Sequence, residues 1–389
     1  MSLAWNSAAT ASREEPANAW KQMPWLILAC AAGLYLLGLS GIERADELSD
    51  GLDMRSRQIF WGVLSLPVLV LAASVPFRSI KPYSYGLFVM TLPLLIVVFF
   101  MPPRNGARCW IPLGWFDMQP SELAKQTFIL GLSYYLMHRD NYRRIPGLVA
   151  PFLIALVPMG LILREPDLGS AMVFPPVLFA MLFAAGAKRW HLALVVILGI
   201  ACTPLFWQAM NAEQRSRITA LFTQMDSGPN PLGDRYHQHQ SKLVIALGGV
   251  WGSELSGPAM DDPSAYRLFA GQTDFVFCWV CERWGLWGGL LTLVLYALLF
   301  GRALMIAAAT REPFGRLIAV GITVQLATQT LINAGMTVGL MPIAGITLPL
   351  MSYGGSSLLS TAVGLGLLIN VALHPGYEIG HEPFLFRGR

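Results

Sequence analysis

Charge is scarce in this 389-residue sequence. Asp, Glu, Lys and Arg together make up 13% of the residues, about half of the roughly 25% that is usual for soluble domains. Hydrophobic residues make up 54%, which excludes a water-soluble globule and a disordered chain. The five cysteines are too few for a disulfide scaffold, and the formal net charge of +4 is too small to indicate binding to nucleic acid. The composition therefore predicts an all-α polytopic membrane protein.

Long apolar runs take the place of the missing charge. A helix that spans a bilayer needs about 20 predominantly apolar residues, and the sequence contains ten segments of that kind. The fourth is the least apolar, because Glu122 and Lys125 lie in its first turn. Prolines interrupt the sixth and seventh, which helical bundles tolerate. We predict ten transmembrane helices, at 23–41, 58–76, 83–101, 122–138, 147–163, 169–187, 190–208, 275–301, 317–338 and 355–373.

Lys and Arg are distributed unevenly between alternate loops. Cytoplasmic loops are enriched in these residues, and the set of loops that includes both termini holds more than twice as many as the short loops of the other set. This asymmetry predicts a cytoplasmic N-terminal tail (1–22), a membrane domain (23–373) and a cytoplasmic C-terminal tail (374–389). The segment 209–274, between the seventh and eighth helices, is then a long extracytoplasmic loop.

Polar residues gather at the predicted outer ends of the helices, where they are costly and mark functional sites. Three of the clusters also have a structural interpretation: Glu122 and Lys125 form an ion pair on one helix face, Asp167 caps a helix, and Thr273 or Asp274 caps another. The four clusters are 105–125 with Arg108, Glu122 and Lys125; 164–171 with Glu165 and Asp167; 271–275 with Asp274; and the Pro/Gly-broken stretch 329–357 with Gln329, Asn333 and Ser356.

Two further patterns are weak signals for a metal site. Cys278 and Cys281 form a C-x-x-C pair inside an apolar helix, without a second pair or a nearby histidine. His237 and His239 lie in the long loop. We expect buried apolar cysteines and a polar loop segment.

The polar blocks resemble, in order, the motifs of the SEDS family (shape, elongation, division and sporulation), whose best-known members are RodA and FtsW. The resemblance extends from residue 23 to 373, and its last block is long and specific. The matching blocks are NGARCWIPLG and QPSELAK within 105–125, EPDLGSA at 165–171, QS…GG…G at 240–252, TDFVF at 273–277, and Q329…N333-A-G-M followed by GLMPIAGITLPLMSYGGSS through 357.

The resemblance implies a ten-helix glycosyltransferase of the bacterial cytoplasmic (inner) membrane. Such proteins polymerise the glycan strands of peptidoglycan from the membrane lipid called lipid II, for cell shape or division, with a class B penicillin-binding protein as transpeptidase partner. The catalytic aspartate of the family falls on Asp274. The candidate substrate-binding residues are Arg108, Glu122, Lys125, Asp167, Gln329, Asn333 and Ser356.

The implied reaction releases a pyrophosphate, whose charge must be stabilised. Arg108, Lys125 and the backbone of 354–357 are the candidates for that role. A divalent cation, Mg²⁺ or Mn²⁺, would help, with Asp167 or Glu165 as candidate ligands, although the residues define no complete ligand set.

Three positions depart from the family pattern. Cys109 stands where the family often has Arg, Gln272 where it commonly has His, and Arg283 where it has the second Glu of a pair.

Two alternatives remain open at this point. A lipid II flippase is expected to carry polar residues along the whole depth of the bundle. A non-catalytic scaffold is expected to have a degraded site.

Overall fold

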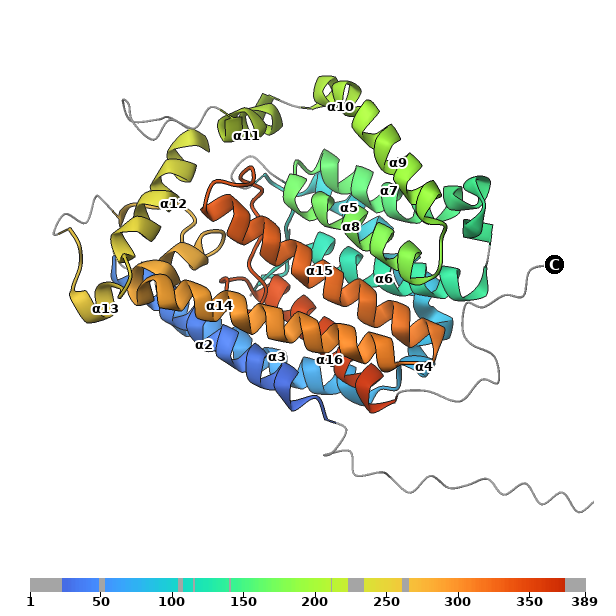
Figure 1. Cartoon of the computed structure of the whole chain (residues 1–389), viewed down its shortest axis with the longest axis horizontal. Coiled ribbons are helices and arrows are strands. Elements are labelled where there is room, and N and C mark those ends of the chain that lie inside the picture. The colour runs from blue at the N-terminus through green and yellow to red at the C-terminus, as the bar shows by residue number, and fades with distance from the viewer. Residues whose placement is uncertain are drawn as a thin grey trace, which may run out of the picture.

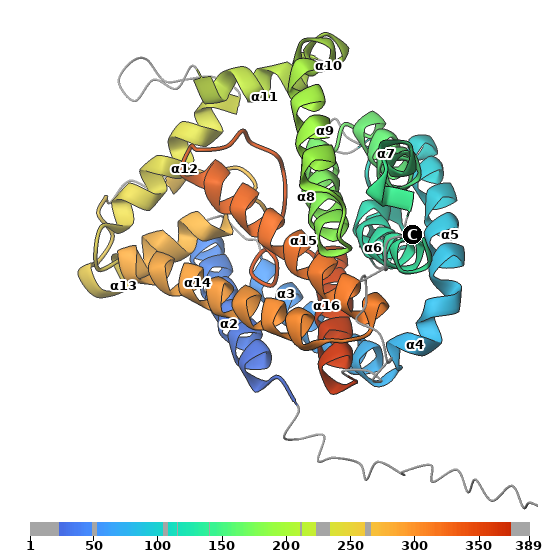
Figure 2. The ribbon, with the colours of Figure 1, turned by 45° about the vertical axis from the view of Figure 1, so that its right-hand side comes forward.

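The protein is described by a computed structural model over residues 23–48, 53–103, 108–114, 116–139, 141–210, 212–222, 234–260 and 266–374. Helices pack side by side in one bundle, with α15 running through its middle (Figures 1 and 2). In the first half the elements are α2 (Trp25–Glu47), α3 (Met54–Ser74), α4 (Phe77–Ile80), η1 (Lys81–Tyr83), α5 (Ser84–Val97), η2 (Val98–Phe100), β1 (Ile111–Pro112), β2 (Asp117–Met118), α6 (Pro120–His138), η3 (Asn141–Arg143), η4 (Ile145–Leu148) and α7 (Val149–Arg164).

The second half continues the bundle and adds helices at one end of it. Its elements are α8 (Leu168–Ala184), α9 (Arg189–Ala201), α10 (Thr203–Ala209), α11 (Ala212–Phe222), α12 (Asp234–Gly248), α13 (Ser253–Ser256), α14 (Val276–Ala309), α15 (Pro313–Thr337) and α16 (Gly355–Leu373).

Seven of the ten predicted spans coincide with helices that are long and apolar enough to cross a bilayer. The prediction of an all-α, multi-pass membrane protein is therefore confirmed, while the count of ten stays a prediction. In the described part of the chain, these seven spans are Trp25–Glu47, Met54–Ser74, Phe77–Phe100, Ile145–Arg164, Val276–Ala309, Pro313–Thr337 and Gly355–Leu373.

The other three predicted spans correspond to α6, to α8 and to the pair α9 and α10. The helices α8 and α9 are apolar but short. In α6, 13 of the 19 residues are buried, including Glu122, Lys125 and Gln126. This helix is a core element whose polar residues are enclosed by protein, which explains its weak apolar signal.

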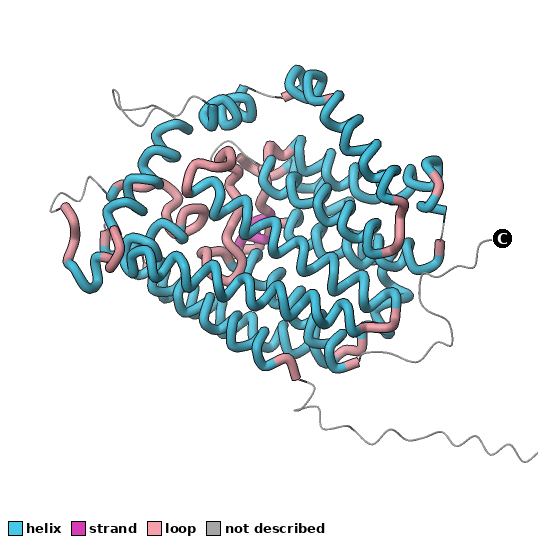
Figure 3. The backbone as a smooth tube through the Cα atoms, in the orientation of Figure 1, coloured by secondary structure: helices cyan, strands magenta, loops and turns pink. Residues whose placement is uncertain are grey.

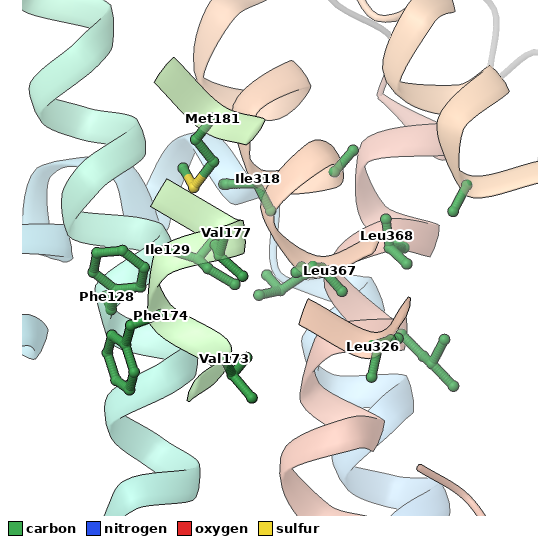
Figure 4. Packing of buried hydrophobic residues seen from close by; sticks show 14 of the residues in the cluster. Phe128, Ile129, Val173, Phe174, Val177, Met181, Ile318, Leu326, Leu367 and Leu368 are labelled. Carbon is green, nitrogen blue, oxygen red and sulfur yellow. The ribbon is translucent and has the colours of Figure 1, made fainter. Parts of the chain in front are cut away.

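Helices that are far apart in sequence form the closest pairs. The helix α2 packs along α14, and α3 packs along α16. Glycines permit the close approach of backbones that membrane helices use: a Cβ on Gly41 of α2 would lie 3.2 Å from Val276 O of α14, and one on Gly366 of α16 would lie 2.6 Å from Leu69 O of α3. Elsewhere in the bundle, α6, α8, α15 and α16 pack against one another through apolar side chains. These side chains include Phe128, Phe174, Ile318 and Leu367 (Figure 4).

The predicted long loop 209–274 is partly helical. Its described residues include α11, α12 and α13, and the helices α10, α11 and α12 lie along one end of the bundle in both views (Figures 1 and 2). The β1–β2 hairpin lies close to the irregular chain between α15 and α16, as Figure 3 shows. Irregular backbone from several regions of the sequence thus gathers in one place.

Asn370 fastens the opposite end of α16 to the turn after α3. Its side chain is fully buried. Its Oδ1 accepts from Phe77 N (3.0 Å), and its Nδ2 donates to the carbonyl oxygens of Ala73 (2.8 Å) and Val75 (2.6 Å). The side-chain amide of Asn370 therefore pairs backbone N–H and C=O groups of this turn, which have no partners in a helix.

We predict that Asn370→Leu lowers the free energy of unfolding by about 2 kcal/mol or more, because it leaves several buried backbone groups unpaired. Thermal unfolding in detergent, monitored by size-exclusion chromatography, measures the loss of stability. The same substitution at the exposed Asn141, whose side-chain Oδ1 accepts from the Tyr135 hydroxyl (3.0 Å), is the control. Equal losses for the two variants would contradict the role assigned to Asn370.

Candidate active site

A cavity of about 420 Å³ opens where α6, α8, α14 and α16 begin. Its wall combines residues from all four predicted polar clusters with residues of the long segment 209–274. The residues that line it are Trp110, Gln119, Glu122, Ser170, Arg217, His237, Phe269, Ala270, Thr273, Asp274, Phe275, Ile343, Gly345, Ile346, Thr347, Tyr353, Gly354, Ser356 and Ser357.

Four helix N-termini meet at this cavity. Gln119 precedes α6, Ser170 lies in the first turn of α8, Phe275 precedes α14 and Gly354 precedes α16, and all four residues line the wall. The N-terminus of a helix carries a partial positive charge and unpaired N–H groups. Three of the four helices have no side-chain cap. The wall therefore favours an anionic group in the cavity.

Asp274 is held by backbone contacts on both sides. Its N–H donates to Ala270 O (2.9 Å), and its own carbonyl oxygen accepts from Asn333 Nδ2 (2.8 Å). The preceding turn is also anchored, because Tyr353 N donates to Gln272 O (2.9 Å). The carboxylate faces Gly345, where a Cβ would stand 3.8 Å from Asp274 Oδ2. The side chain is thus directed at the irregular chain between α15 and α16.

The surroundings of Asp274 raise its pKa to about 6. Burial is the main cause, since it penalises the ionised form, and the negative charge of Asp167 adds to it. A hydrogen bond from Thr273 and the positive charge of Arg217 act in the opposite direction. The carboxyl group is mostly ionised at pH 7 and accepts a proton more readily than an ordinary aspartate, as a general base requires.

Glu122 and Lys125 form the predicted ion pair. Their side chains are 2.7 Å apart and buried. Glu122 lines the cavity and Lys125 does not. A buried carboxylate is costly without a partner, and Lys125 supplies that partner for Glu122 beside the cavity.

Asp167 is both the helix cap and the link between two helices. Its Oδ1 accepts from Ser170 N (2.9 Å) at the start of α8, and its Oδ2 accepts from Gln119 Nε2 (3.2 Å). Asp167 lies behind the wall, whereas both of these partners line it. Asp167 therefore caps α8, as predicted, and also holds two residues of the cavity wall in place.

Glu165 is fully buried, and neither of its carboxylate oxygens has a hydrogen-bond partner within the described residues. Burial, assisted by the charge of Asp167, raises the pKa of Glu165 to about 9, so the group is neutral at pH 7. The thiol of Cys109 donates to Glu165 O (3.3 Å), and burial raises the pKa of that thiol as well.

No three His, Cys, Asp or Glu side chains of the described ranges come together as metal ligands. Asp167 and Glu165 offer at most one ionised carboxylate at neutral pH. These two residues alone do not fit a divalent cation, and the suggested ion stays a prediction.

The other predicted site residues differ in their relation to the cavity. Ser356 lines it, accepts from Gln119 N (3.2 Å) and donates to Asp117 O (2.8 Å). Asn333 and Gln329 are buried in α15 without lining it. Arg108 does not line it either. Its guanidinium donates instead to Phe99 O (2.7 Å). The geometry therefore places Arg108 and Gln329 outside the wall.

Asn333 bonds backbone groups on two sides of the cavity, and its expected contact with substrate stays a prediction. Its Nδ2 donates to Asp274 O and also to Ile346 O (2.6 Å). One buried amide thus joins the Asp274 turn to the chain that faces it across the cavity.

The departures from the family pattern also lie outside the wall. Gln272 Nε2 donates to Asp46 Oδ1 (3.4 Å), and Arg283 pairs with Glu43 and Glu254, each at 2.9 Å. Cys278 and Cys281 are buried in α14, as expected of apolar cysteines.

Two lining residues escape the sequence analysis. Arg217 lies on α11 and His237 on α12. The segment 209–274 reads as one loop because α11 lacks a hydrophobic stripe, and the pair of histidines indicates only a polar segment. Residues 238–256 do form a short amphipathic pattern in the sequence, and this pattern overlaps α12.

Comparisons with known proteins agree with this architecture. Residues 21–376 match the family model for FtsW, RodA and SpoVE, described as a cell cycle protein. The chain is 32% identical to a probable peptidoglycan glycosyltransferase FtsW of Aliivibrio salmonicida (93% of this chain, 91% of the relative) and 30% identical to the stage V sporulation protein E of Bacillus subtilis (90% and 96%).

Solved structures are similar over the same extent. A chain from a peptidoglycan synthase complex, described for its coordination of polymerization and crosslinking, aligns with a TM-score of 0.76 at 30% identity, over 90% of this chain and 97% of that chain. The rod shape determining protein RodA of Thermus thermophilus aligns with a TM-score of 0.66 at 30% identity, over 91% and 97%. The resemblance to the SEDS proteins is thereby confirmed: the chain belongs to the FtsW/RodA/SpoVE family.

Proposed function

We propose that the protein is a peptidoglycan glycosyltransferase that joins lipid II disaccharides into glycan strands and releases undecaprenyl pyrophosphate. The observation that carries the proposal is the carboxylate of Asp274 in a cavity formed by four helix N-termini. Relatives that cover nine-tenths of the chain are named as glycosyltransferases of this type.

Asp274 acts as the general base. It takes the proton from the sugar 4-hydroxyl of the acceptor while that oxygen forms a bond to the anomeric carbon of the donor. The bond from the anomeric carbon to the phosphate oxygen breaks, and its electron pair leaves with the pyrophosphate. A single displacement of this kind inverts the anomeric centre and needs one essential carboxylate.

The leaving pyrophosphate gains negative charge in the transition state. Fixed N–H dipoles stabilise such charge because they are already oriented when it develops. The N-termini of α6, α14 and α16 supply these dipoles, and Arg217 supplies a positive charge on the same wall. Arg217 takes the role that the sequence suggested for Arg108 and Lys125.

The position of the charged groups favours polymerisation over lipid transport. The cavity lies at one end of the bundle. Among the described residues, the side chains buried between α6, α8, α15 and α16 beyond Glu122 and Lys125 are apolar, such as those in Figure 4, or polar without charge, such as Gln126 and Gln325. A path for a charged headgroup would require charged groups along that depth. The intact set of Asp274, Glu122 and Asp167 also argues against a non-catalytic scaffold.

The cellular setting follows from the same family. We place the protein in the bacterial inner membrane, with both termini in the cytoplasm and the cavity on the opposite side. A class B penicillin-binding protein is the proposed partner, in keeping with the similar structure of a synthase that couples polymerization to crosslinking.

The first prediction concerns the base. Asp274→Asn should lower glycan polymerisation from lipid II in proteoliposomes by about 10²- to 10⁴-fold, since the amide accepts no proton. Gel analysis of the glycan products measures the rate. Asp53→Asn is the matched control, because Asp53 caps α3 through Ser56 N and asparagine caps equally well. Near-normal polymerisation by Asp274→Asn would contradict the assignment.

The second prediction concerns Arg217. Its charge lowers the pKa of Asp274, so Arg217→Gln should raise that pKa and move the acid limb of the pH–rate profile to higher pH. Arg215→Gln is the control, because Arg215 lies on the same helix and binds Trp207 O and Gln208 O. An acid limb that stays in place in Arg217→Gln would remove Arg217 from the electrostatics of the site.

The third prediction concerns Asn333. Asn333→Asp and Asn333→Ala both lose the two amide donations and should lower kcat by about tenfold to a hundredfold, the cost of misplacing a catalytic group. KM for lipid II should stay within about twofold of the value for the unaltered protein, because the substitution removes no contact with the bound substrate. Thr323→Ala in the same helix, where the hydroxyl donates to Ala319 O within that helix, is the control. A raised KM with an unchanged kcat would indicate direct substrate contact.

A further inference from the structure

The helix α14 is broken at Gly285, and the chain that follows α12 occupies the break. Gly285 has φ 65° and ψ −158°, a conformation open to glycine and strained for other residues. The N–H of Leu286, freed by the break, donates to Gly249 O (3.0 Å). We call residues 249–257 the docked turn.

Glycines bring the docked turn into direct backbone contact with α14. A Cβ on Gly285 would collide with Val250 O, and a Cβ on Gly252 would collide with Arg283 O. Gly248, the last residue of α12, is equally close to Cys281 O. The docked turn is therefore held on α14 by its backbone, and its large apolar side chains do not take part in that contact.

The docked turn presents large apolar side chains on its outer surface. Val250 is 49% exposed, Trp251 59% and Leu255 72%. The same exposed surface continues on α14 with Leu286 and Trp287. The charged residue of the turn, Glu254, is held by Arg283 at 2.9 Å. The turn is thus amphipathic, with its carboxylate paired to protein and its apolar groups uncovered.

The part of α14 after the break is by itself long enough to cross a bilayer. On α2, the residues before the break contact its C-terminal part: Arg44 pairs with Glu282 at 2.8 Å, and Trp284 Nε1 donates to Ser40 Oγ (2.6 Å). After it, Leu295 meets Gly33, in the middle of α2. Residues 286–309 extend over about 36 Å at 1.5 Å per residue, enough for a hydrocarbon core of about 30 Å.

We propose that the docked turn lies in the membrane interface, with Trp251 and Leu255 among the lipids of the leaflet nearest the cavity. The bilayer is the partner because the exposed surface is continuous with the lipid-facing side of α14. Tryptophan is favoured at that level, where its ring contacts acyl chains and its N–H meets water. Uncovered in water, the same apolar patch would be costly.

The anchor has a structural consequence that is independent of the reaction catalysed. The docked turn ends α12, and α12 carries His237 into the cavity wall. Insertion of the turn therefore sets the height of α12 above the membrane. The inference goes beyond the proposed function and does not rest on it.

The test is photolabelling of the full chain in vesicles of phosphatidylcholine and phosphatidylglycerol that contain a phosphatidylcholine with a diazirine on its acyl chain. Mass spectrometry locates the adducts. We expect adducts on residues 250–255 as well as on 286–294 of α14, and none on Ser216 and Thr219, which are exposed and polar on α11. Labelled α14 with an unlabelled docked turn would overturn the proposal.

A double variant, Trp251→Asn with Leu255→Asn, gives a second readout. It should lose the adducts on the docked turn and keep those on 286–294, which also shows that the protein is folded and inserted. Undiminished labelling of the rest of the turn would contradict the part assigned to these two side chains.

Discussion

Irregular backbone near a membrane must have every polar group satisfied by protein, and the site depends on that constraint. The chain between α15 and α16 forms no helix, yet buried side chains pair its backbone. Gln58 donates to Ser352 O (3.0 Å) and accepts from Gly354 N (3.3 Å), while Asn333 donates to Ile346 O. Tyr296 donates to Pro349 O (2.5 Å). These contacts from α3, α14 and α15 give the cavity wall a fixed shape.

The same chain is what makes the electrostatics possible. Once it is fixed, the N-termini of four helices converge on one space, and the positive ends of their dipoles surround it. The acidic groups then divide by environment. Glu122 is paired with Lys125. Glu165 is neutral at pH 7, because no partner within the described residues compensates its burial. Asp274 is partly compensated by Thr273 and Arg217 and has an intermediate pKa of about 6. That intermediate value suits a group that must accept a proton at neutral pH.

The sequence identified the helices because apolar runs leave a strong linear signal. It also placed the four polar clusters at one end, since costly residues at membrane depth stand out against an apolar background. Asp274, Glu122 and Ser356, each from a different cluster, line one cavity as that interpretation expects. The weak signal of α6 has a physical cause, because its polar residues are satisfied inside the protein.

What the sequence did not show depends on contacts across the fold. Arg217 lies on a polar helix without a hydrophobic stripe, so nothing local distinguishes it from a solvated loop residue. Asn333 resembles a ligand-binding amide until its two backbone partners, 59 and 13 residues away, are known. The sequence does not reveal the break of α14 at Gly285 either, because an isolated glycine inside an apolar run is common.

The central claim is that Asp274 is the base, with an ionisation set by its burial. The most direct test is the pH dependence of kcat/KM for lipid II polymerisation by the unaltered protein in proteoliposomes. The account predicts a loss of activity as the pH falls through about 6, because protonation of Asp274 removes the base. A rate that stays constant down to the ordinary aspartate range near pH 4 would contradict it.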